Sequence, residues 1–82
     1  MNTILTHDAE PHPAGGYTLT ARYSNRLGVP YHCPNIRPDD LSLICARTWL
    51  GLIQEAFPHL TPDEREYVLT GLTPEEWDAM LL

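Results

Sequence analysis

The stretch from Asp39 to Phe57, DDLSLICARTWLGLIQEAF, constrains the fold more than any other part of the sequence. Successive residues of an α-helix are about 100° apart, and at this spacing the apolar residues cover an arc of roughly 200°. A helix that covers a single surface needs an apolar stripe of only about 100°. Pro58 disfavours the α conformation in the residue before it and ends the pattern. We therefore expect one helix over 39–57, buried between two layers, with Trp49 near the middle of its buried arc.

Two stretches before this helix alternate between apolar and polar residues, as half-buried β-strands do. Residues 17–24, YTLTARYS, and residues 27–33, LGVPYHC, are expected to pair as an antiparallel hairpin. The second strand should be an edge strand, because Pro30 has no N–H to donate. Residues 2–7, NTILTH, can add another edge strand, and residues 8–16, with two prolines and two glycines, are expected to form a loop. In the second strand, the side chains expected to face the core are Leu27, Val29, Tyr31 and Cys33.

One short pattern occurs twice after Pro58, at residues 60–64 (LTPDE) and 72–76 (LTPEE). In each copy the threonine is expected to be the N-cap, the proline suits the first helical position, and the glutamate closes a capping box. Gly71 lies where a left-handed helix end is expected. The sequence therefore predicts short helices at about 62–70 and 74–81, docked on the second apolar side of the central helix.

These elements predict an α+β fold in a single domain, residues 1–82. An N-terminal antiparallel β-hairpin or three-stranded sheet packs on a central helix, and two short C-terminal helices follow. No apolar run is long enough for a membrane span, and the N-terminus lacks the pattern of a signal peptide. We expect a cytoplasmic protein of a host cell, in which Cys33 and Cys45 are free thiols. A disulfide between these two cysteines stays open as the alternative.

The net charge of −6 lies entirely in the last third of the chain. Residues 1–54 are balanced, whereas residues 55–82 set seven acids against Arg65 alone. Proteins hold nucleic acids by neutralising phosphates with lysine and arginine, so we do not expect a nucleic-acid partner. Six acids near the starts of the two short helices are expected to form one face for a basic partner protein, with a merely solubilising face as the alternative. They are Asp63, Glu64, Glu66, Glu75, Glu76 and Asp78.

The sequence contains none of the common catalytic or cofactor motifs. It has no GxSxG, no glycine-rich phosphate loop and no HExxH, so we expect no enzymatic activity. Its histidines and cysteines lack the paired spacing of structural zinc sites, and we expect no metal or other cofactor. Two alternatives are a metal-binding accessory protein and a small nucleic-acid-binding regulator. The regulator would use the arginines near the hairpin, which are Arg22, Arg26 and Arg37.

The C-terminal segment DEREYVLTGLTPEEWDAML, residues 63–81, resembles the ends of many small phage and mobile-element proteins. The shared pattern is Arg-Glu-aromatic, two variable residues, Ser/Thr-Gly, a hydrophobic residue, a short polar stretch and aromatic-Asp. The matching residues are Arg65, Glu66, Tyr67, Thr70, Gly71, Leu72, Trp77 and Asp78. Some relatives have cysteines in the polar stretch where this chain has residues 73–76, so the resemblance implies no metal role. It implies an accessory protein that inhibits or redirects a host protein by binding it, as anti-CRISPR proteins do.

Overall fold

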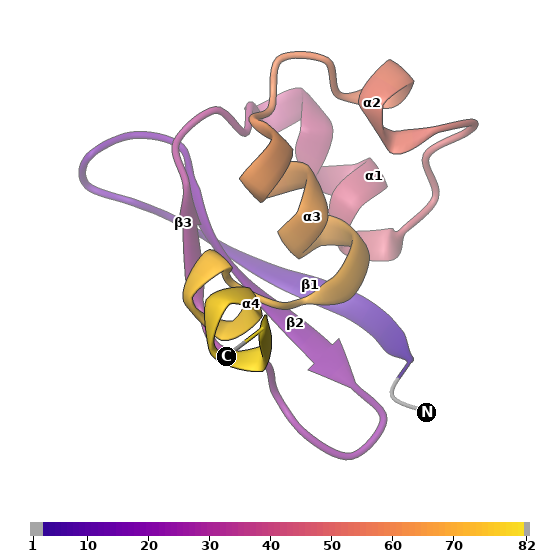
Figure 1. The fold of residues 1–82 in the computed structure, drawn as a ribbon. Coiled ribbons are helices and arrows are strands. Elements are labelled where there is room, and N and C mark those ends of the chain that lie inside the picture. Colours follow the sequence, from indigo (N-terminus) through magenta and orange to yellow (C-terminus); the bar gives the residue numbers. More distant parts are fainter. Residues whose placement is uncertain (1–2, 82) are drawn as a thin grey trace.

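The computed structural model describes residues 3–81 as a three-stranded antiparallel sheet whose helices all lie over one face (Figure 1). The strands follow the order β1 (Ile4–Pro11), β2 (Tyr17–Tyr23) and β3 (Tyr31–Cys33). The helical elements are a 3-10 turn η1 (Pro38–Asp40), α1 (Leu41–Ala46), α2 (Ile53–Ala56), α3 (Pro62–Thr70) and α4 (Pro74–Leu81). The predicted α+β class, the three-stranded sheet and the two C-terminal helices are confirmed. Within residues 3–81, no helix has both the length and the apolar character that crossing a bilayer requires.

The central strand β2 has the alternation that its sequence predicts. Leu19 and Ala21 are fully buried beneath the helices, whereas Arg22 is exposed on the other face of the sheet. β1 is longer than expected, because residues 8–11 pair with β2 instead of forming a loop. This extension puts acidic side chains on the open face of an edge strand, where water solvates them. The connection to β2 is therefore a tight turn over residues 12–16.

β3 is much shorter than the predicted strand, and two of its expected core residues are exposed. Only Tyr31–Cys33 pair with β2, while Leu27 forms an isolated bridge with Arg22. The expectation that Leu27 and Val29 face the core is wrong, since 57% and 48% of their surfaces are exposed. Pro30 supplies no N–H to continue the ladder, so regular pairing begins only at Tyr31. Before Pro30, the Gly28 amide still donates to the Ala21 carbonyl at 2.7 Å, and the Arg26 carbonyl accepts from the Tyr23 amide at 2.9 Å.

The predicted helix over 39–57 is wrong, because the chain turns sharply in its middle. α1 ends at Arg47, which adopts a left-handed conformation with φ 56° and ψ 48°. The Arg47 guanidinium donates to the Val68 carbonyl and lies 5.2 Å from the centre of the Trp49 ring. Gly51 also has a positive φ, of 75°. Glycine has a low helix propensity and tryptophan only a moderate one, so little helical stability is lost when the chain turns here.

The apolar residues of this segment consequently do not share one buried arc. Ile44, Ile53 and Phe57 are buried, whereas Leu50 is 90% exposed and Leu52 is 58% exposed. Trp49 lies in the loop between α1 and α2, only partly buried, with its ring edge-to-face to Phe57 at 5.9 Å. The loop thus presents leucines to solvent at a position where the helical pattern predicts core.

α3 packs directly on the sheet, so the expected arrangement with a helix between two layers is also wrong. Tyr67 is fully buried, and its hydroxyl accepts from the Ala21 amide at 3.2 Å and donates to the Val29 carbonyl. From the sheet, the Tyr23 hydroxyl donates to the Thr70 carbonyl at 2.7 Å. Because α1 is short and covers mainly β1, the rest of the sheet is left for α3.

The two helix starts and the end of α3 agree with the prediction. Thr61 Oγ1 accepts from the Glu64 amide at 3.2 Å, and Glu64 Oε1 accepts from the Thr61 amide at 2.7 Å. Thr73 and Glu76 form the same pair of bonds, at 3.2 and 2.9 Å. Gly71 ends α3 in the left-handed region with φ 74°. Both capping boxes are therefore confirmed.

Candidate functional site

Five of the six acids predicted to form one face are at least partly accessible. Glu76 is half-buried, because its carboxylate closes the second capping box. The exception is Glu64, of which only 2% is exposed, and its assignment to an accessible acidic face is wrong. The remaining four acids are exposed, and we use the name α3–α4 acidic face for them as a set; they are Asp63 and Glu66 on α3 and Glu75 and Asp78 on α4.

Glu64 joins the loop after β3 to the start of α3. Its carboxylate accepts from the Asn35 amide at 3.0 Å and from Asn35 Nδ2 at 2.9 Å, in addition to closing the capping box with Thr61. Burial alone would raise the pKa of this carboxyl, but the hydrogen bonds from Thr61 and Asn35 outweigh it and lower the pKa. The capping pattern predicts the contact with Thr61, whereas no local signal predicts the one with Asn35.

Within residues 3–81, no cation forms an ion pair with a carboxylate of the α3–α4 acidic face. Within residues 3–81 there are two ion pairs, Arg22 with Asp8 at 2.8 Å and His59 with Asp40 at 2.7 Å, and neither includes α3 or α4. Arg65, the one arginine or lysine after Arg47, donates to the carbonyls of Phe57 and Leu60. The carboxylates of this face are therefore solvated without a charged partner.

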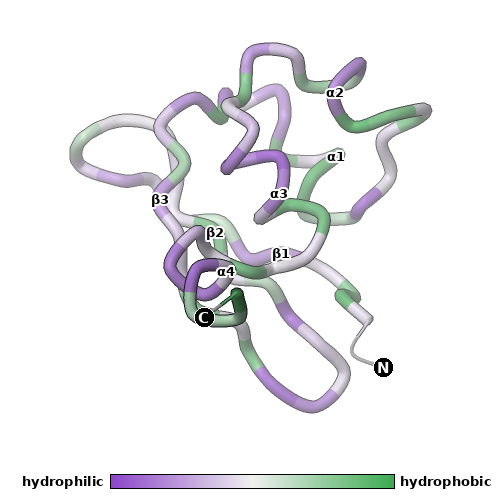
Figure 2. The backbone as a smooth tube through the Cα atoms, in the orientation of Figure 1, coloured by the Kyte–Doolittle hydropathy of each residue, from purple (hydrophilic) through white to green (hydrophobic). Residues whose placement is uncertain are grey.

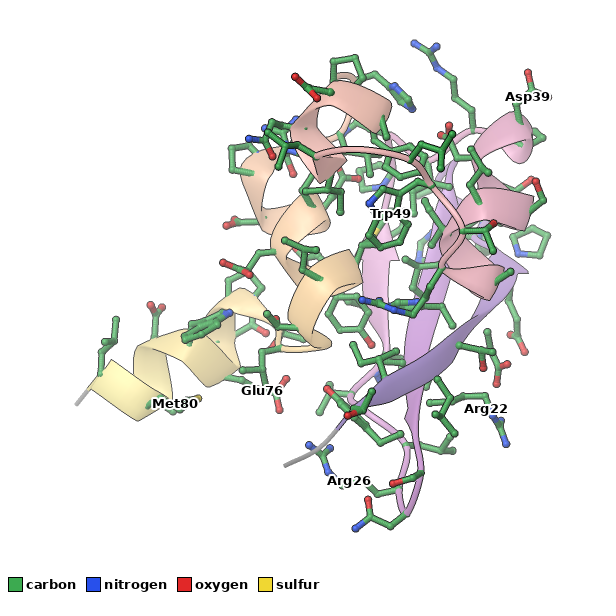
Figure 3. All side chains as sticks on the ribbon, turned by 90° about the vertical axis from the view of Figure 1, so that its right-hand side faces the viewer. Arg22, Arg26, Asp39, Trp49, Glu76 and Met80 are labelled. Carbon is green, nitrogen blue, oxygen red and sulfur yellow. The ribbon has the colours of Figure 1, made fainter. Side chains whose placement is uncertain are left out.

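α4 adds exposed apolar surface beside these acids. No residue of α4 is buried, and Met80 and Leu81 are 63% and 81% exposed. Figure 3 shows α4, with Met80 labelled, extending away from the sheet, and the end of α4 is apolar in Figure 2. Trp77 is half-buried, and its indole nitrogen is buried without a hydrogen-bond partner among residues 3–81. α4 thus combines acids with apolar side chains that the fold leaves uncovered.

A second feature is an open groove of about 370 Å³ between α2 and α3. It is lined by Ile53, Gln54, Pro62, Arg65, Glu66 and Leu69. Leu69 is 43% exposed, and the exposed Leu50 and Leu52 come directly before α2 in the chain. Sequence reasoning missed this groove, because it predicted one unbroken helix over 39–57, with Leu50 and Leu52 in the core and no separate α2.

The three arginines of the alternative nucleic-acid patch do not come together. Arg22 is paired with Asp8, and the Arg26 guanidinium stacks 4.1 Å from the centre of the Tyr23 ring. Arg37 follows β3 and therefore lies at the end of the sheet opposite to Arg26. Figure 3 shows the same separation, with Arg22 and Arg26 far from Asp39, a near neighbour of Arg37 in sequence. The structure thus removes the basic patch on which that alternative depends.

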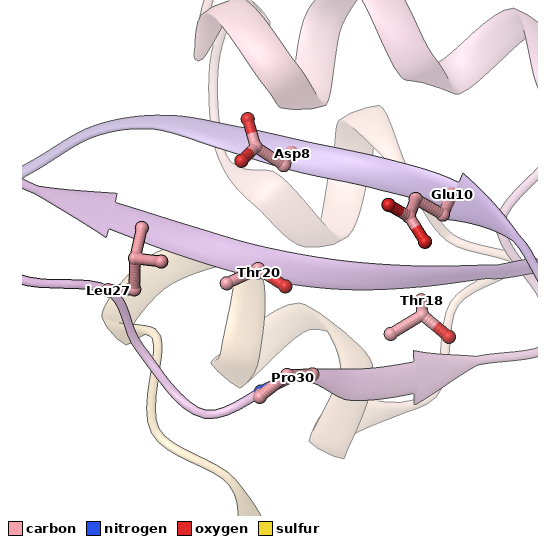
Figure 4. Close-up of a pocket in the computed structure, with 6 residues that line it drawn as sticks. All are labelled: Asp8, Glu10, Thr18, Thr20, Leu27 and Pro30. Carbon is pink, nitrogen blue, oxygen red and sulfur yellow. The ribbon is translucent and has the colours of Figure 1, made fainter.

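The open face of the sheet carries acids rather than a phosphate site. A shallow hollow of about 300 Å³ lies there, shown in Figure 4 and lined by Asp8, Glu10, Thr18, Thr20, Leu27 and Pro30. The two carboxylates along β1 repel phosphate, and no lining residue is basic.

The possible metal ligands are dispersed. Cys33 is buried and Cys45 half-buried, both are free thiols, and burial raises the pKa of Cys33 to about 12. The rings of His12 and His32 stack at 3.6 Å beside the β1–β2 turn, where His32 Nε2 hydrogen-bonds the Gly15 carbonyl at 2.7 Å. Among the described residues, no three histidine, cysteine or acidic side chains are grouped so as to hold a metal ion.

Comparison of the chain with protein-family models, curated proteins and solved structures found no match. The structure shows what the residues of the C-terminal pattern do. Arg65, Tyr67 and Gly71 attach or end α3, since they bond to backbone carbonyls or adopt the left-handed cap. Glu66 and Asp78 are exposed. Three of the eight residues of the pattern are thus explained by the fold, and its exposed acids belong to the α3–α4 acidic face.

Proposed function

We propose that this chain is a small protein-binding module with no catalytic activity of its own, which binds a basic surface of a partner protein. The observation that carries the proposal is the α3–α4 acidic face, whose carboxylates form no ion pair within residues 3–81 and two of which share α4 with the exposed Met80 and Leu81. A solubilising surface needs charge but no exposed apolar side chains. Apolar residues within a charged rim are typical of protein interfaces.

The charge argues for the kind of partner. A patch of one sign attracts a patch of the opposite sign, which raises the association rate and weakens with salt. The surface of a nucleic-acid-handling protein is basic for the reason that nucleic acid is acidic. Together with the resemblance of residues 63–81 to phage and mobile-element proteins, this favours a host protein in the cytoplasm that the module inhibits or redirects.

The test is a pair of charge reversals with equal change in net charge. Glu75→Arg with Asp78→Arg alters the acidic face, whereas Glu10→Arg with Asp39→Arg alters exposed acids elsewhere. Partners captured from host extract by the wild-type chain are purified, and association rates are measured at about 50 and 300 mM salt. We expect the first double variant to associate at least tenfold more slowly at low salt and to lose most of the salt dependence.

Glu76 stays unchanged in this design, because its carboxylate closes a capping box. Circular dichroism and thermal unfolding check that both double variants are folded. If both associate with the partner as fast as the wild type, with the same salt dependence, the acidic face is only solvated surface and the proposal fails.

A further inference from the structure

We propose that the groove between α2 and α3 is a docking site for a positively charged amphipathic helix of a partner protein. The inference rests on the proposed function, and it names the part of the interface that takes the partner's apolar side chains. The groove measures about 370 Å³, near the lower end of the range of about 300–1,000 Å³ for ligand clefts. A site of this size takes one or two side chains from a helix laid across it.

Exposed leucines occur in the groove and in the loop before α2, although the packing of the core does not use them. Leu69 on α3 is 43% exposed, and Leu50 and Leu52 before α2 are 90% and 58% exposed. In Figure 2 the stretch entering α2 is one of the apolar segments on the outside of the molecule. Gly51 turns the chain between the two leucines with φ 75°, so the loop is folded into this conformation rather than continuing a helix. Leu69 lines the groove itself, and Leu52 comes directly before Ile53, which also lines it. Grooves that bind an amphipathic helix offer apolar side chains of this kind to its i and i+4 residues.

The charges of α2 and α3 indicate which kind of partner can bind in the groove. Their exposed charged side chains are Glu55, Asp63 and Glu66, none of them in an ion pair within residues 3–81. Arg65 also lines the groove, but its guanidinium is held by the carbonyls of Phe57 and Leu60. A second copy of the chain would bring acids against acids, since α2, α3 and α4 contain no other basic residue. The complementary occupant is a helix with an apolar stripe and lysine or arginine beside it.

The test uses a designed 18-residue peptide with leucines at helical i, i+3, i+4 and i+7 spacing and lysines elsewhere. Two control peptides replace the leucines by alanine or the lysines by glutamate. Fluorescence anisotropy at about 150 mM salt measures affinity, and amide chemical shifts of the labelled protein locate the peptide. We expect the leucine–lysine peptide to bind at least tenfold more tightly than either control, with shifts concentrated at α2, α3 and the loop before α2.

A matched pair of variants tests the location. Leu69→Gln removes an exposed leucine from the groove, and Leu27→Gln removes one from the opposite face of the sheet. Because neither residue is buried, both variants are expected to fold, and their amide spectra check this directly. Leu69→Gln should lower the affinity for the peptide at least fivefold, and Leu27→Gln should leave the affinity unchanged.

Equal weakening by the two variants, shifts centred on α4, or binding no tighter than that of the alanine control would each overturn the groove assignment. The outcomes also separate this inference from the function on which it rests. If the captured partner is lost on reversing Glu75 and Asp78 but kept by Leu69→Gln, the acidic face stands and the groove fails. If the partner is instead lost in Leu69→Gln but still binds after Glu75 and Asp78 are reversed, the groove assignment stands and α4 has no role in binding.

Discussion

His7 is the clearest case of a single buried residue whose polar side chain lowers the stability of the core. Only 2% of His7 is exposed, and neither ring nitrogen has a hydrogen-bond partner within the described residues. Burial, with a smaller contribution from the positive charge of Arg47, lowers the pKa of His7 from 6.5 to about 4. The folded protein therefore holds the neutral imidazole, whereas the unfolded chain takes up a proton near pH 6.5.

This difference predicts a loss of stability in mild acid. The stabilising effect of the neutral ring is complete above pH 6.5 and is lost as the pH falls toward 4, and the pKa difference corresponds to about 3 kcal/mol. His7→Leu removes the titrating group, so between pH 7 and pH 4 the variant should lose about 3 kcal/mol less unfolding free energy than the wild type. Urea unfolding at several pH values measures the difference.

His12→Leu is the matched control, because His12 lies in the turn after β1 and not in the core. Glu64, whose pKa is lowered, also loses its stabilising effect as the pH falls, but it does so equally in all three proteins. If the unfolding free energies of His7→Leu and the wild type depended on pH in the same way, the His7 imidazole would not be buried away from water as the structure shows.

At the scale of the elements, the end of α3 depends on a glycine for two separate reasons. Gly71 and Gly51 have nearly the same positive φ, of 74° and 75°. A Cβ on Gly71 would overlap the Tyr23 hydroxyl and lie 2.9 Å from the Ala21 Cβ, whereas one on Gly51 meets nothing nearer than Glu55 Oε1 at 3.5 Å. The left-handed conformation alone costs an alanine about 1–2 kcal/mol.

We therefore expect Gly51→Ala to cost about 1–2 kcal/mol and Gly71→Ala to cost on the order of 3 kcal/mol or more. The second variant must also move α3 from the sheet, which breaks the bond from Tyr23 to Thr70. Thermal and urea unfolding of the two variants side by side measure the costs. Equal costs would mean that α3 and the sheet are not as closely packed as the structure shows.

The net charge of −6 of the whole molecule is concentrated in the last third of the chain, because all of the excess acid belongs to residues 55–82. Like charges at this density repel each other in the folded state, and added salt screens them as the Debye length falls from about 30 Å at 0.01 M to about 3 Å at 1 M. Sodium chloride should therefore raise the unfolding free energy by a few tenths to about 1 kcal/mol.

The matched variant for this prediction neutralises Asp63→Asn, Glu75→Gln and Asp78→Asn together. It should be at least as stable as the wild type at low salt and should respond less to added salt. An identical salt response in the two proteins would show that these acids are too far apart in the folded molecule to repel.

Within this one chain, the features predicted from sequence are those that depend on residues close together. The alternation of β2 needs only its own side chains, and the helix starts at Thr61 and Thr73 need a glutamate three residues later. Gly71 as a helix end is equally local, since few other residues adopt a positive φ at low cost. Periodicity and capping therefore determined β2, the two C-terminal helices and the α+β class, but not the bounds of β1 and β3.

Tertiary structure decided the rest, because it depends on groups distant in sequence. The long helix predicted over 39–57 breaks at Arg47, whose guanidinium finds the Val68 carbonyl. Glu64 leaves the acidic face because Asn35, 29 residues away, binds its carboxylate. The groove between α2 and α3 forms where the segment 39–57 is broken and α2 becomes a separate helix, and the same break exposes Leu50 and Leu52, which the periodicity predicts as core. The hydrophobic pattern shows that a surface is apolar, but which neighbour covers it, or whether any does, is decided when the whole chain packs.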